Sequence, residues 1–520
     1  MKSKVSNEQR NKGKFYTPTL FVDYAHKMIS EALGDDWKDE YVVWDNCCGT
    51  KNLTRDYRFK ELYCSTLENA ELDISSRYNP EATSFQFDFL NDPLEKLPKG
   101  LLEAFEKNKK IVFFLNPPYA TTNGLAINAK TKSNIATTKI NLLMKRDKIG
   151  RCSENLYAQF LYRIINICQT YNLQNVHICL FSPITFLTQP TFISLRYVMF
   201  KYLKYNSGCY FNASNFGGVA PTWGISFSIL SSNKHNNDLN NFNYKIIENK
   251  DGEISVIQNK IFYNQDNLDD ISKYLSNTIK GNIKEDSISL SSGLVQSKNI
   301  IKFSKNGIGY VSMNNQGVVF TLCKPFSHTH GIDITKDNFY KIVQYISSRN
   351  LINKNWINCK DSYFIGEENN EFINNSIIYS IFHDYCQCTS LNNINNEFFW
   401  MSKAELEELA NTYNNDDCYS DVHTSEDRFI YKKLQEITLT PEAQTVLDKA
   451  CEIVRNTFKY RELFNEEHPE YQINNWDCGW YQIKALAKEF AKDDLNEFKE
   501  LYKKLADKMR PMVYELGFLK

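Results

Sequence analysis

Four residues of this chain combine groups that could do chemistry: an amide, two rigid prolines and an aromatic ring, in Asn116-Pro117-Pro118-Tyr119. They follow the apolar run Ile111–Leu115, which predicts a buried strand of a parallel sheet. Open α/β sheets bind their ligands at the carboxyl ends of such strands. Because the prolines fix φ and lack N–H donors, the local carbonyls stay free to accept hydrogen bonds. The segment could therefore accept hydrogen bonds from an amino group while its ring stacks on a flat ligand.

A second polar segment, Asp45-Asn46-Cys47-Cys48-Gly49-Thr50-Lys51, follows the apolar run Tyr41–Trp44. An acidic residue ends the predicted strand, and small residues with a glycine then turn the chain toward a helix. Such residues let the backbone approach a ligand closely. After the next predicted strand, Glu68 could accept from the ribose hydroxyls of a nucleoside, with Thr66 and Glu71 as alternative positions.

Four segments occur in a fixed order along the chain: Phe15-Tyr16-Thr17-Pro18, Asp45–Thr50, Asp88-Phe89-Leu90 and Asn116–Tyr119. Together they resemble the motifs of S-adenosylmethionine-dependent N6-adenine DNA methyltransferases with the gamma-type motif order. The resemblance implies a doubly wound, Rossmann-like α/β methyltransferase sheet, S-adenosylmethionine as cofactor and a flipped adenine in double-stranded DNA as target. One residue departs from the family pattern, because Lys51 stands where the second glycine of the cofactor loop is usual. Either the loop carries this lysine outward or the cofactor site is altered.

The resemblance also implies roles for individual residues. The Asn116 side-chain oxygen and the Pro117 carbonyl, beside Pro118, would accept the two hydrogens of the adenine amino group, and Tyr119 would stack on the flipped base. A second aromatic residue for the base would be Phe216, with Trp223 as the alternative. The implied cofactor contacts are Tyr16, Thr17, Pro18, Asp45, Cys48, Gly49, Glu68, Asp88 and Phe89.

A basic segment lies between Tyr119 and Ser153, where seven positive residues accompany the single acidic residue Asp147, a local net charge of +6 (7 − 1) in a chain whose formal net charge is -1. Its polar composition predicts a long loop. Its charge predicts contact with DNA phosphates near the flipped base. The basic residues are Lys130, Lys132, Lys139, Lys145, Arg146, Lys148 and Arg151.

Alternating predicted strands and helices must position these groups, and they predict a methyltransferase catalytic domain over residues 1–235. The predicted strands are Tyr41–Trp44, Leu62–Leu67, Ser84–Phe89, Ile111–Leu115 and Val176–Phe181, with helices over Leu20–Leu33 and Glu154–Thr170. The polar stretch Ser231–Asn243 predicts a linker or an exposed loop. A mixed α+β target-recognition region is expected over 244–425, and a helical region over 426–520.

Net charge, apolar runs and cysteine spacing restrict the possible classes of protein. The near-neutral net charge means that any DNA-binding surface must be local. Neither a signal-peptide core nor a long apolar run is apparent, so we expect a cytoplasmic protein with no membrane partner. The scattered cysteines predict free thiols and no metal site. A cognate restriction endonuclease of the same system could be a further partner, although it is not expected as a stable requirement. The competing hypotheses are a methyltransferase of RNA or of protein glutamine, and a non-catalytic DNA-binding protein on the same scaffold.

Overall fold

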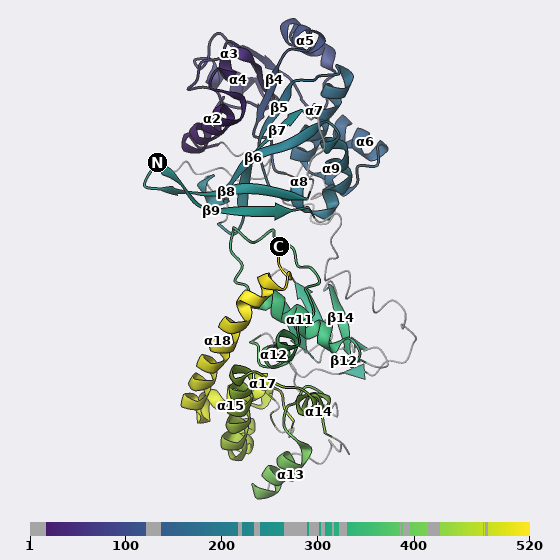
Figure 1. Cartoon of the computed structure of the whole chain (residues 1–520), viewed down its shortest axis with the longest axis vertical. Coiled ribbons are helices and arrows are strands. Elements are labelled where there is room, and N and C mark those ends of the chain that lie inside the picture. The colour runs from purple at the N-terminus through teal and green to yellow at the C-terminus, as the bar shows by residue number, and fades with distance from the viewer. Residues whose placement is uncertain are drawn as a thin grey trace. The chain divides into compact units, whose positions relative to one another are not determined.

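The computed structural model describes residues 17–120, 137–216, 221–232, 240–264, 289–290, 301–302, 307–314, 317–321, 330–384, 386–387, 396–413, 427–471, 473 and 477–520. The chain forms two compact units, the first comprising Met1–Asn267 with Lys354–Asp361 and the second Leu268–Asn353 with Ser362–Lys520 (Figure 1). Within the described ranges, no helix is both long and apolar enough to cross a membrane.

The first unit is built on a nine-stranded mixed sheet with the strand order β3-β2-β1-β4-β5-β7-β6-β8-β9. Strands β3, β2, β1, β4 and β5 run parallel, and β7 is antiparallel to both β5 and β6. The strands are β1 (Val42–Asp45), β2 (Glu61–Thr66), β3 (Thr83–Gln86), β4 (Ile111–Leu115), β5 (Val176–Ser182), β6 (Leu203–Asn212), β7 (Gly224–Ser232), β8 (Asn241–Lys250) and β9 (Glu253–Tyr263). The predicted α/β fold class is therefore confirmed.

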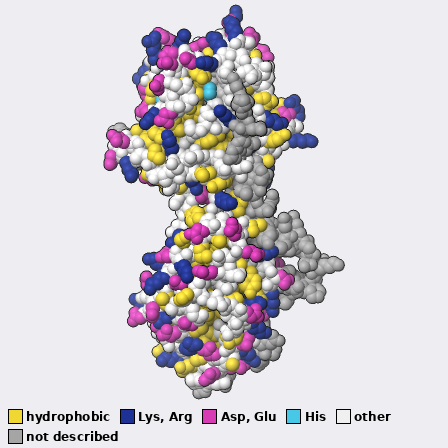
Figure 2. All heavy atoms as spheres, in the orientation of Figure 1, with side chains coloured by type: hydrophobic (Ala, Val, Ile, Leu, Met, Phe, Trp, Pro, Cys, Tyr) yellow, Lys and Arg dark blue, Asp and Glu magenta, His cyan; other side chains and the backbone are white. Residues whose placement is uncertain are grey.

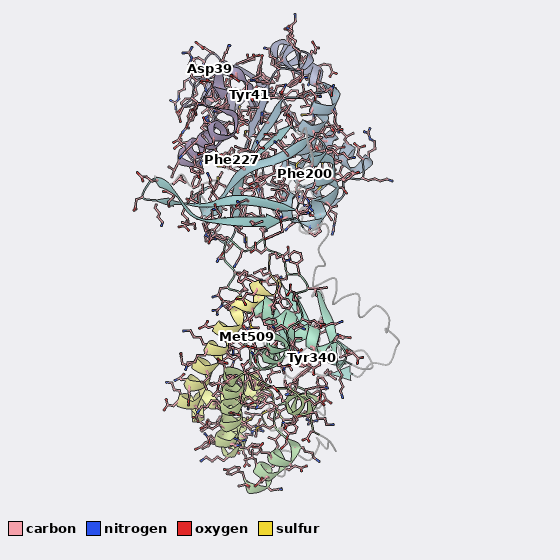
Figure 3. The ribbon with its side chains drawn as sticks, in the orientation of Figure 1. Asp39, Tyr41, Phe200, Phe227, Tyr340 and Met509 are labelled. Carbon is pink, nitrogen blue, oxygen red and sulfur yellow. The ribbon has the colours of Figure 1, made fainter. Side chains whose placement is uncertain are left out.

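Both faces of this sheet are covered, which explains why β4 is apolar at every position. Val112 and Phe114 of β4 pack into one core cluster, and Ile111, Phe113 and Leu115 pack into the other. Figure 3 shows Phe227 of β7 and Phe200 of α9 in this unit, and they belong to opposite clusters. The helices are α2 (Thr19–Leu33), α3 (Trp37–Glu40), α4 (Asn69–Ser75), α5 (Lys99–Glu106), α6 (Lys139–Arg146), α7 (Leu156–Thr170), α8 (Thr185–Thr188) and α9 (Ile193–Phe200).

The topology brings the predicted polar segments to one edge of the sheet. Strands β1, β2, β4 and β5 are parallel, so their carboxyl ends share that edge. The strand order reverses between β1 and β4, and ligands of open α/β sheets bind at such a switch point. Trp44 pairs with Phe113 in the register of these two strands.

The sheet continues beyond the expected end of the catalytic domain at residue 235. Strand β8 pairs in parallel with β6, and β9 pairs with β8. The segment Ser231–Asn243, predicted as a linker or an exposed loop, begins inside β7 and ends inside β8, and its residues 233–239 lie outside the described residues. At the start of β8, Phe242 and Tyr244 are buried, whereas the asparagines on either side of Phe242 are exposed. The boundary at 235 therefore falls within the sheet.

A short segment far along the chain also belongs to the first unit. The ring of Trp356 stacks on Tyr210 at 5.7 Å between centroids, and its carbonyl accepts a hydrogen bond from the Tyr210 hydroxyl at 3.1 Å. The Lys260 ammonium pairs with Asp361 at 2.7 Å, and both side chains are largely buried. These contacts explain why residues 354–361 group with the sheet although their neighbours in sequence belong to the second unit.

The second unit combines a small sheet of order β14-β12-β13-β15 with a set of helices around one core. That core runs from Val311 to Leu519, so it joins residues of the expected region 426–520 to those residues of the expected region 244–425 that lie in the second unit. The strands of the second unit are β10 (Ser289–Leu290), β11 (Ile301–Lys302), β12 (Gly307–Asn314), β13 (Gly317–Thr321), β14 (His330–Thr335) and β15 (Cys386–Gln387).

The helices of the second unit confirm the predicted helical C-terminal region. They are α11 (Phe339–Asn350), α12 (Asn370–Ile381), α13 (Lys403–Thr412), α14 (Phe429–Glu436), α15 (Pro441–Thr457), α16 (Arg461–Glu467), α17 (Trp480–Phe490) and α18 (Lys492–Glu515). Figure 3 labels Tyr340 of α11 and Met509 of α18 in this unit. Over both units, basic and acidic side chains are interspersed on the face seen in Figure 2, in keeping with the near-neutral net charge.

Candidate functional site

The predicted proline corner, Asn116–Tyr119, directly follows β4 and is internally hydrogen-bonded. The Tyr119 hydroxyl donates to Asn116 Oδ1 at 2.6 Å. The Tyr119 ring is partly exposed, but its hydroxyl is enclosed, and burial raises the pKa of Tyr119 well above its ordinary value. The tyrosine is therefore a neutral donor at ordinary pH. Among the described residues, the Pro117 carbonyl accepts no hydrogen bond.

Thr17 connects the proline corner to the cofactor loop, which we define as Asp45–Leu53. Its hydroxyl oxygen accepts from Asn116 Nδ2 at 2.9 Å, across 99 residues of sequence. Its carbonyl accepts from Asn52 Nδ2 at 3.2 Å, and its side chain is buried. The sequence predicted Thr17 as a cofactor residue and missed this link. Only the order of the motifs hints at it, because no local pattern joins positions so far apart.

The cofactor loop begins with two buried polar side chains that have no hydrogen-bond partner among the described residues. These are the Asp45 carboxylate, 0% exposed, and the Asn46 amide, 1% exposed. The Cys47 N–H lies near the carboxylate without the geometry of a hydrogen bond. Burial raises the pKa of Asp45 to about 8, which Cys47 and the Lys51 ammonium only partly oppose. Buried polar groups are normally paired, so this pair indicates a place for a polar ligand.

Lys51 adopts the backbone conformation that a glycine would supply. Its φ is 59°, in the left-handed region, and Gly49 two residues earlier has a φ of 48°. Its side chain is buried and donates from Nζ to the Tyr78 carbonyl at 2.9 Å. The loop thus has a left-handed turn at this position and directs the Lys51 ammonium to the Tyr78 carbonyl, so the lysine is buried rather than carried outward.

Two acidic residues, Glu68 and Glu71, follow strand β2. Glu68, the predicted ribose acceptor, lies partly exposed at the start of α4, whereas Glu71 is buried and accepts from the Thr66 hydroxyl at 2.5 Å. Burial and the carboxylates of Asp45 and Glu71 raise the pKa of the Cys47 thiol well above its ordinary value. The roles of Glu68 and of its alternative Glu71 stay predictions.

The predicted adenine contacts, Asp88 and Phe89, are both engaged within the protein. Asp88 Oδ1 accepts from the N–H groups of Leu90 and Asn91, and Oδ2 accepts from Asn91 Nδ2 at 2.8 Å. Each carboxylate oxygen has two lone pairs, so Oδ2 keeps some capacity for a ligand. Phe89 is buried and stacks on Phe160 at 4.9 Å between centroids, so its ring serves the core.

The structure brings Trp223, not Phe216, to the proline corner. Phe216 is fully buried and lies parallel to Phe211 in the core at 5.8 Å between centroids. Trp223 is partly exposed, and its ring centroid lies 6.5 Å from that of Tyr119 with the planes at 79°. The sequence alone could not separate the two aromatics, because both occur in the same connection between β6 and β7.

The predicted basic loop is in part a helix, which corrects one expectation. Thr138 caps α6 by accepting from the Asn141 N–H, and Ile140 and Met144 are buried beneath it. The apolar positions of this short helix were hidden by its many charges. Its basic side chains stay exposed, although Arg146 pairs with Asp147 at 3.0 Å. The exposed set is Lys139, Lys145, Arg146, Lys148 and Arg151. Lys130, Lys132 and the predicted cofactor residue Tyr16 lie outside the described residues.

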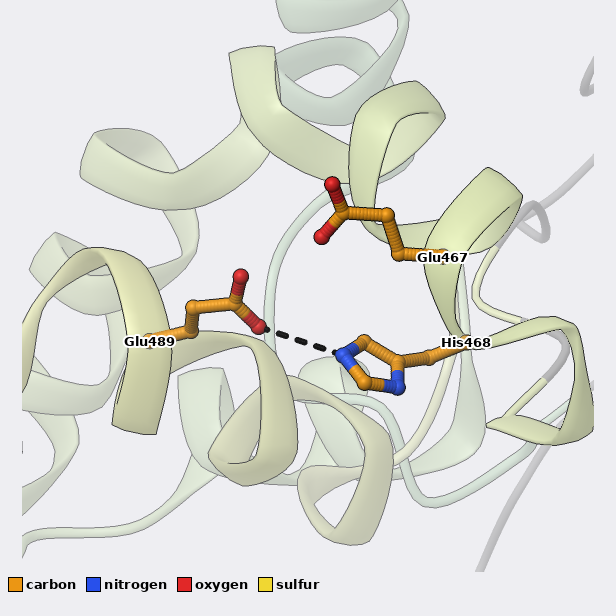
Figure 4. A group of neighbouring side chains, drawn as sticks. All are labelled: Glu467, His468 and Glu489. Atoms are coloured by element: carbon orange, nitrogen blue, oxygen red, sulfur yellow. Dashed lines mark ion pairs between the residues drawn. The ribbon is translucent and has the colours of Figure 1, made fainter.

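One group in the second unit has the residue types of a metal site. Ligand atoms of Glu467, His468 and Glu489 lie within 4.8 Å of one another (Figure 4). The two glutamates are exposed, and His468 Nε2 lies 3.4 Å from Glu489. The cysteines in the described part of the chain are free thiols.

Comparisons of sequence return no match. No protein-family model matches this chain, and no curated protein matches it.

Comparison of structures finds partial similarity to methyltransferases. The type I restriction-modification system methyltransferase subunit from Streptococcus thermophilus matches with a TM-score of 0.33 and 13% identity, over 47% of this chain and 50% of that one. A candidate class I S-adenosylmethionine-dependent methyltransferase from Listeria monocytogenes matches with 0.30 and 11%, over 44% and 63%. The DrdV–DNA complex matches with 0.33 and 16%, over 46% and 28%. The chain thus spans less than two thirds of each of these proteins, and such scores are too low to assign a function.

Proposed function

We propose that the chain is an S-adenosylmethionine-dependent DNA methyltransferase that modifies N6 of a flipped adenine. The observation that carries the proposal is the meeting of three separate segments at the switch point of the sheet. Asn116 after β4, Asn52 in the cofactor loop after β1 and Thr17 before α2 are joined by direct hydrogen bonds. The same three segments carry the resemblance found in the sequence.

The cofactor loop has a donor set that suits S-adenosylmethionine. A buried carboxylate without a partner, as in Asp45, can accept from an ammonium group, and the Asn46 amide can both donate and accept. The positive φ of Gly49 lets backbone approach a ligand closely. When bound, S-adenosylmethionine supplies an electrophilic methyl group. A raised pKa of the Asp45 carboxyl suits a group that becomes charged only as its cationic partner arrives.

The proline corner supplies hydrogen-bond acceptors for the target amine. Asn116 Oδ1 and the Pro117 carbonyl can each accept one hydrogen of N6, which makes the nitrogen lone pair more available. Before that, the base must displace the Tyr119 hydroxyl from Asn116 Oδ1. The rings of Tyr119 and Trp223 then offer faces for stacking, a contact worth about 1–3 kcal/mol per base. The base must leave the duplex to reach these groups.

DNA contact is assigned to the exposed basic residues at the end of α6. Lys145→Glu with Lys148→Glu should weaken DNA binding and reduce the salt slope, since each lost phosphate contact removes about 0.9 from that slope. The matched control reverses two exposed lysines elsewhere on the first unit, Lys27→Glu with Lys60→Glu. Fluorescence anisotropy over a salt series measures both slopes. Equal slopes for the two double variants would rule out the assigned surface.

The test of the function itself is a transfer assay with labelled cofactor. The purified chain is incubated with S-adenosylmethionine carrying a tritiated methyl group and with double-stranded DNA, and the digested nucleosides are separated. We expect label in N6-methyldeoxyadenosine, formed about 100- to 1,000-fold more slowly by the Asn116→Ala variant. Label in N4-methyldeoxycytidine, or only in added RNA or protein, would reassign the substrate. Calorimetric binding of cofactor without any transfer would favour the non-catalytic alternative.

A further inference from the structure

We infer that Thr17 is a positioning residue that sets which end of the Asn116 amide faces the target amine. The inference rests on the proposed function, in which Asn116 Oδ1 accepts a hydrogen from N6. An asparagine amide has an accepting end and a donating end, which point in opposite directions. If the amide turned over, it would present N–H groups to an amine whose hydrogens need an acceptor. Orientation of this side chain therefore decides whether the corner can act.

The hydrogen bonds of Thr17 select the productive orientation. Its hydroxyl oxygen accepts from Asn116 Nδ2 at 2.9 Å, which directs Oδ1 away from Thr17 and toward the Tyr119 hydroxyl. The Tyr119 hydroxyl marks the place that an N6 hydrogen would take, because it already donates to the same oxygen at 2.6 Å. Once the base displaces that hydroxyl, the contact with Thr17 continues to hold the amide nitrogen.

Thr17 is itself fixed from two directions. It is 2% exposed and directly precedes Pro18, whose carbonyl accepts the first backbone hydrogen bonds of α2. Its own carbonyl accepts from Asn52 Nδ2, and Asn52 Oδ1 in turn accepts from the Thr50 hydroxyl and from Arg55. The asparagine that holds Thr17 thus has its own amide orientation set. Thr17 thus contacts both the cofactor loop and the Asn116 amide, which fixes their positions relative to each other.

The test compares Thr17→Val with Thr17→Ser. Valine keeps the shape of threonine and removes the hydroxyl, whereas serine keeps the hydroxyl and loses only a methyl group. We expect Thr17→Val to lower kcat for methyl transfer by about tenfold to a hundredfold, as misplacement of a catalytic group does. We expect the dissociation constant for S-adenosylmethionine, measured by calorimetry, to change by less than about threefold, and Thr17→Ser to recover most of kcat. Thr19→Val is the matched control, because Thr19 is exposed two residues away.

A readout that does not depend on turnover separates this inference from the proposed function. With 15N-labelled asparagine, the Asn116 side-chain amide, assigned through Asn116→Ala, should exchange its protons slowly in the wild-type chain and in Thr17→Ser, and rapidly in Thr17→Val. If no transfer occurs in the wild type, the proposed function fails while exchange still reports on Thr17. Thr17→Val with unchanged kcat and slow exchange would overturn the inference. So would a loss confined to cofactor affinity, and Thr17→Ala replaces the valine variant if that variant does not fold.

Discussion

The proline corner and the cofactor loop lie side by side at the same sheet edge, yet their polar side chains differ in hydrogen bonding. In the corner, both ends of the Asn116 amide have partners inside the protein, Thr17 and Tyr119. In the loop, the Asp45 carboxylate and the Asn46 amide are buried with no partner among the described residues. An unpaired buried polar group costs free energy, whereas a paired one costs little.

Under the proposed function, this difference predicts two kinds of binding. The unpaired buried groups of the loop cost free energy that a charged ligand can recover. A cofactor would therefore bind there by forming the hydrogen bonds that these groups lack. The corner has no such cost, so a target base must exchange one hydrogen bond for another and gains little from that step. Affinity for the cofactor and selectivity for the target amine would then arise in separate places, which substitutions can distinguish.

The largest effect is expected from removing the acceptor of the corner. Asn116→Ala should lower kcat for methyl transfer by about 100- to 1,000-fold, the usual loss when one group that stabilises developing charge is removed. Cofactor affinity should stay within about threefold, because the loop keeps its own groups. Turnover and calorimetry measure the two effects. Parallel losses in both would mean that the corner and the loop act as one site.

The counterpart in the loop is Asp45→Asn, which should act on cofactor affinity. Truncating one partner of a buried charge pair costs about 2–5 kcal/mol of binding, so the dissociation constant should rise by more than tenfold. At saturating cofactor, kcat should change much less than in Asn116→Ala. Calorimetry and transfer kinetics at raised cofactor concentration measure the two quantities. An unchanged affinity would remove Asp45 from the cofactor site.

The same variant should be more stable than the wild type, and increasingly so at higher pH. The pKa of Asp45 is raised from 3.8 to about 8 in the folded chain. The folded state therefore holds a proton that the unfolded state releases, and the free energy of unfolding falls as pH rises from about 4 to about 8. Asparagine abolishes this dependence. Melting temperatures at pH 5 and pH 8 should diverge between the two proteins, and equal shifts at both values would contradict the buried carboxylate.

The local features of this site could be predicted from the sequence, whereas the contacts between distant segments could not. The run Ile111–Leu115 is predicted to the residue, because a strand covered on both faces leaves a continuous apolar signature. The polar residues at strand ends are equally readable. By contrast, the choice of Trp223 over Phe216 and the contact between Thr17 and Asn116 depend on packing between distant segments. Strand β8 was missed because its exposed positions are Asn and Lys, which also dominate loops.

Substitution of Lys51 tests whether its positive charge helps the Asp45 carboxyl to ionise. Lys51→Met keeps a long side chain and removes the ammonium that opposes the raised pKa of Asp45. We expect cofactor affinity at pH 7 to weaken by roughly threefold to tenfold, since one unit of pKa is a factor of ten, and to recover as pH rises. Lys51→Arg is the matched variant, because it keeps a positive charge at the same position. A calorimetric pH series that is identical in Lys51→Met and wild type would exclude the coupling.

The smallest effect should come from the hydroxyl that closes the corner. Tyr119→Phe keeps the ring for stacking and removes the donor that the base must displace from Asn116 Oδ1. A net hydrogen bond is worth about 1 kcal/mol, so KM for DNA should fall by up to about fivefold while kcat stays nearly constant. Tyr119→Ala removes the ring as well and should raise KM instead. Steady-state kinetics on one duplex substrate separates the two variants. A fall in kcat for Tyr119→Phe would mean that the hydroxyl takes part in transfer, and the corner would then need its internal hydrogen bond in the reacting state as well.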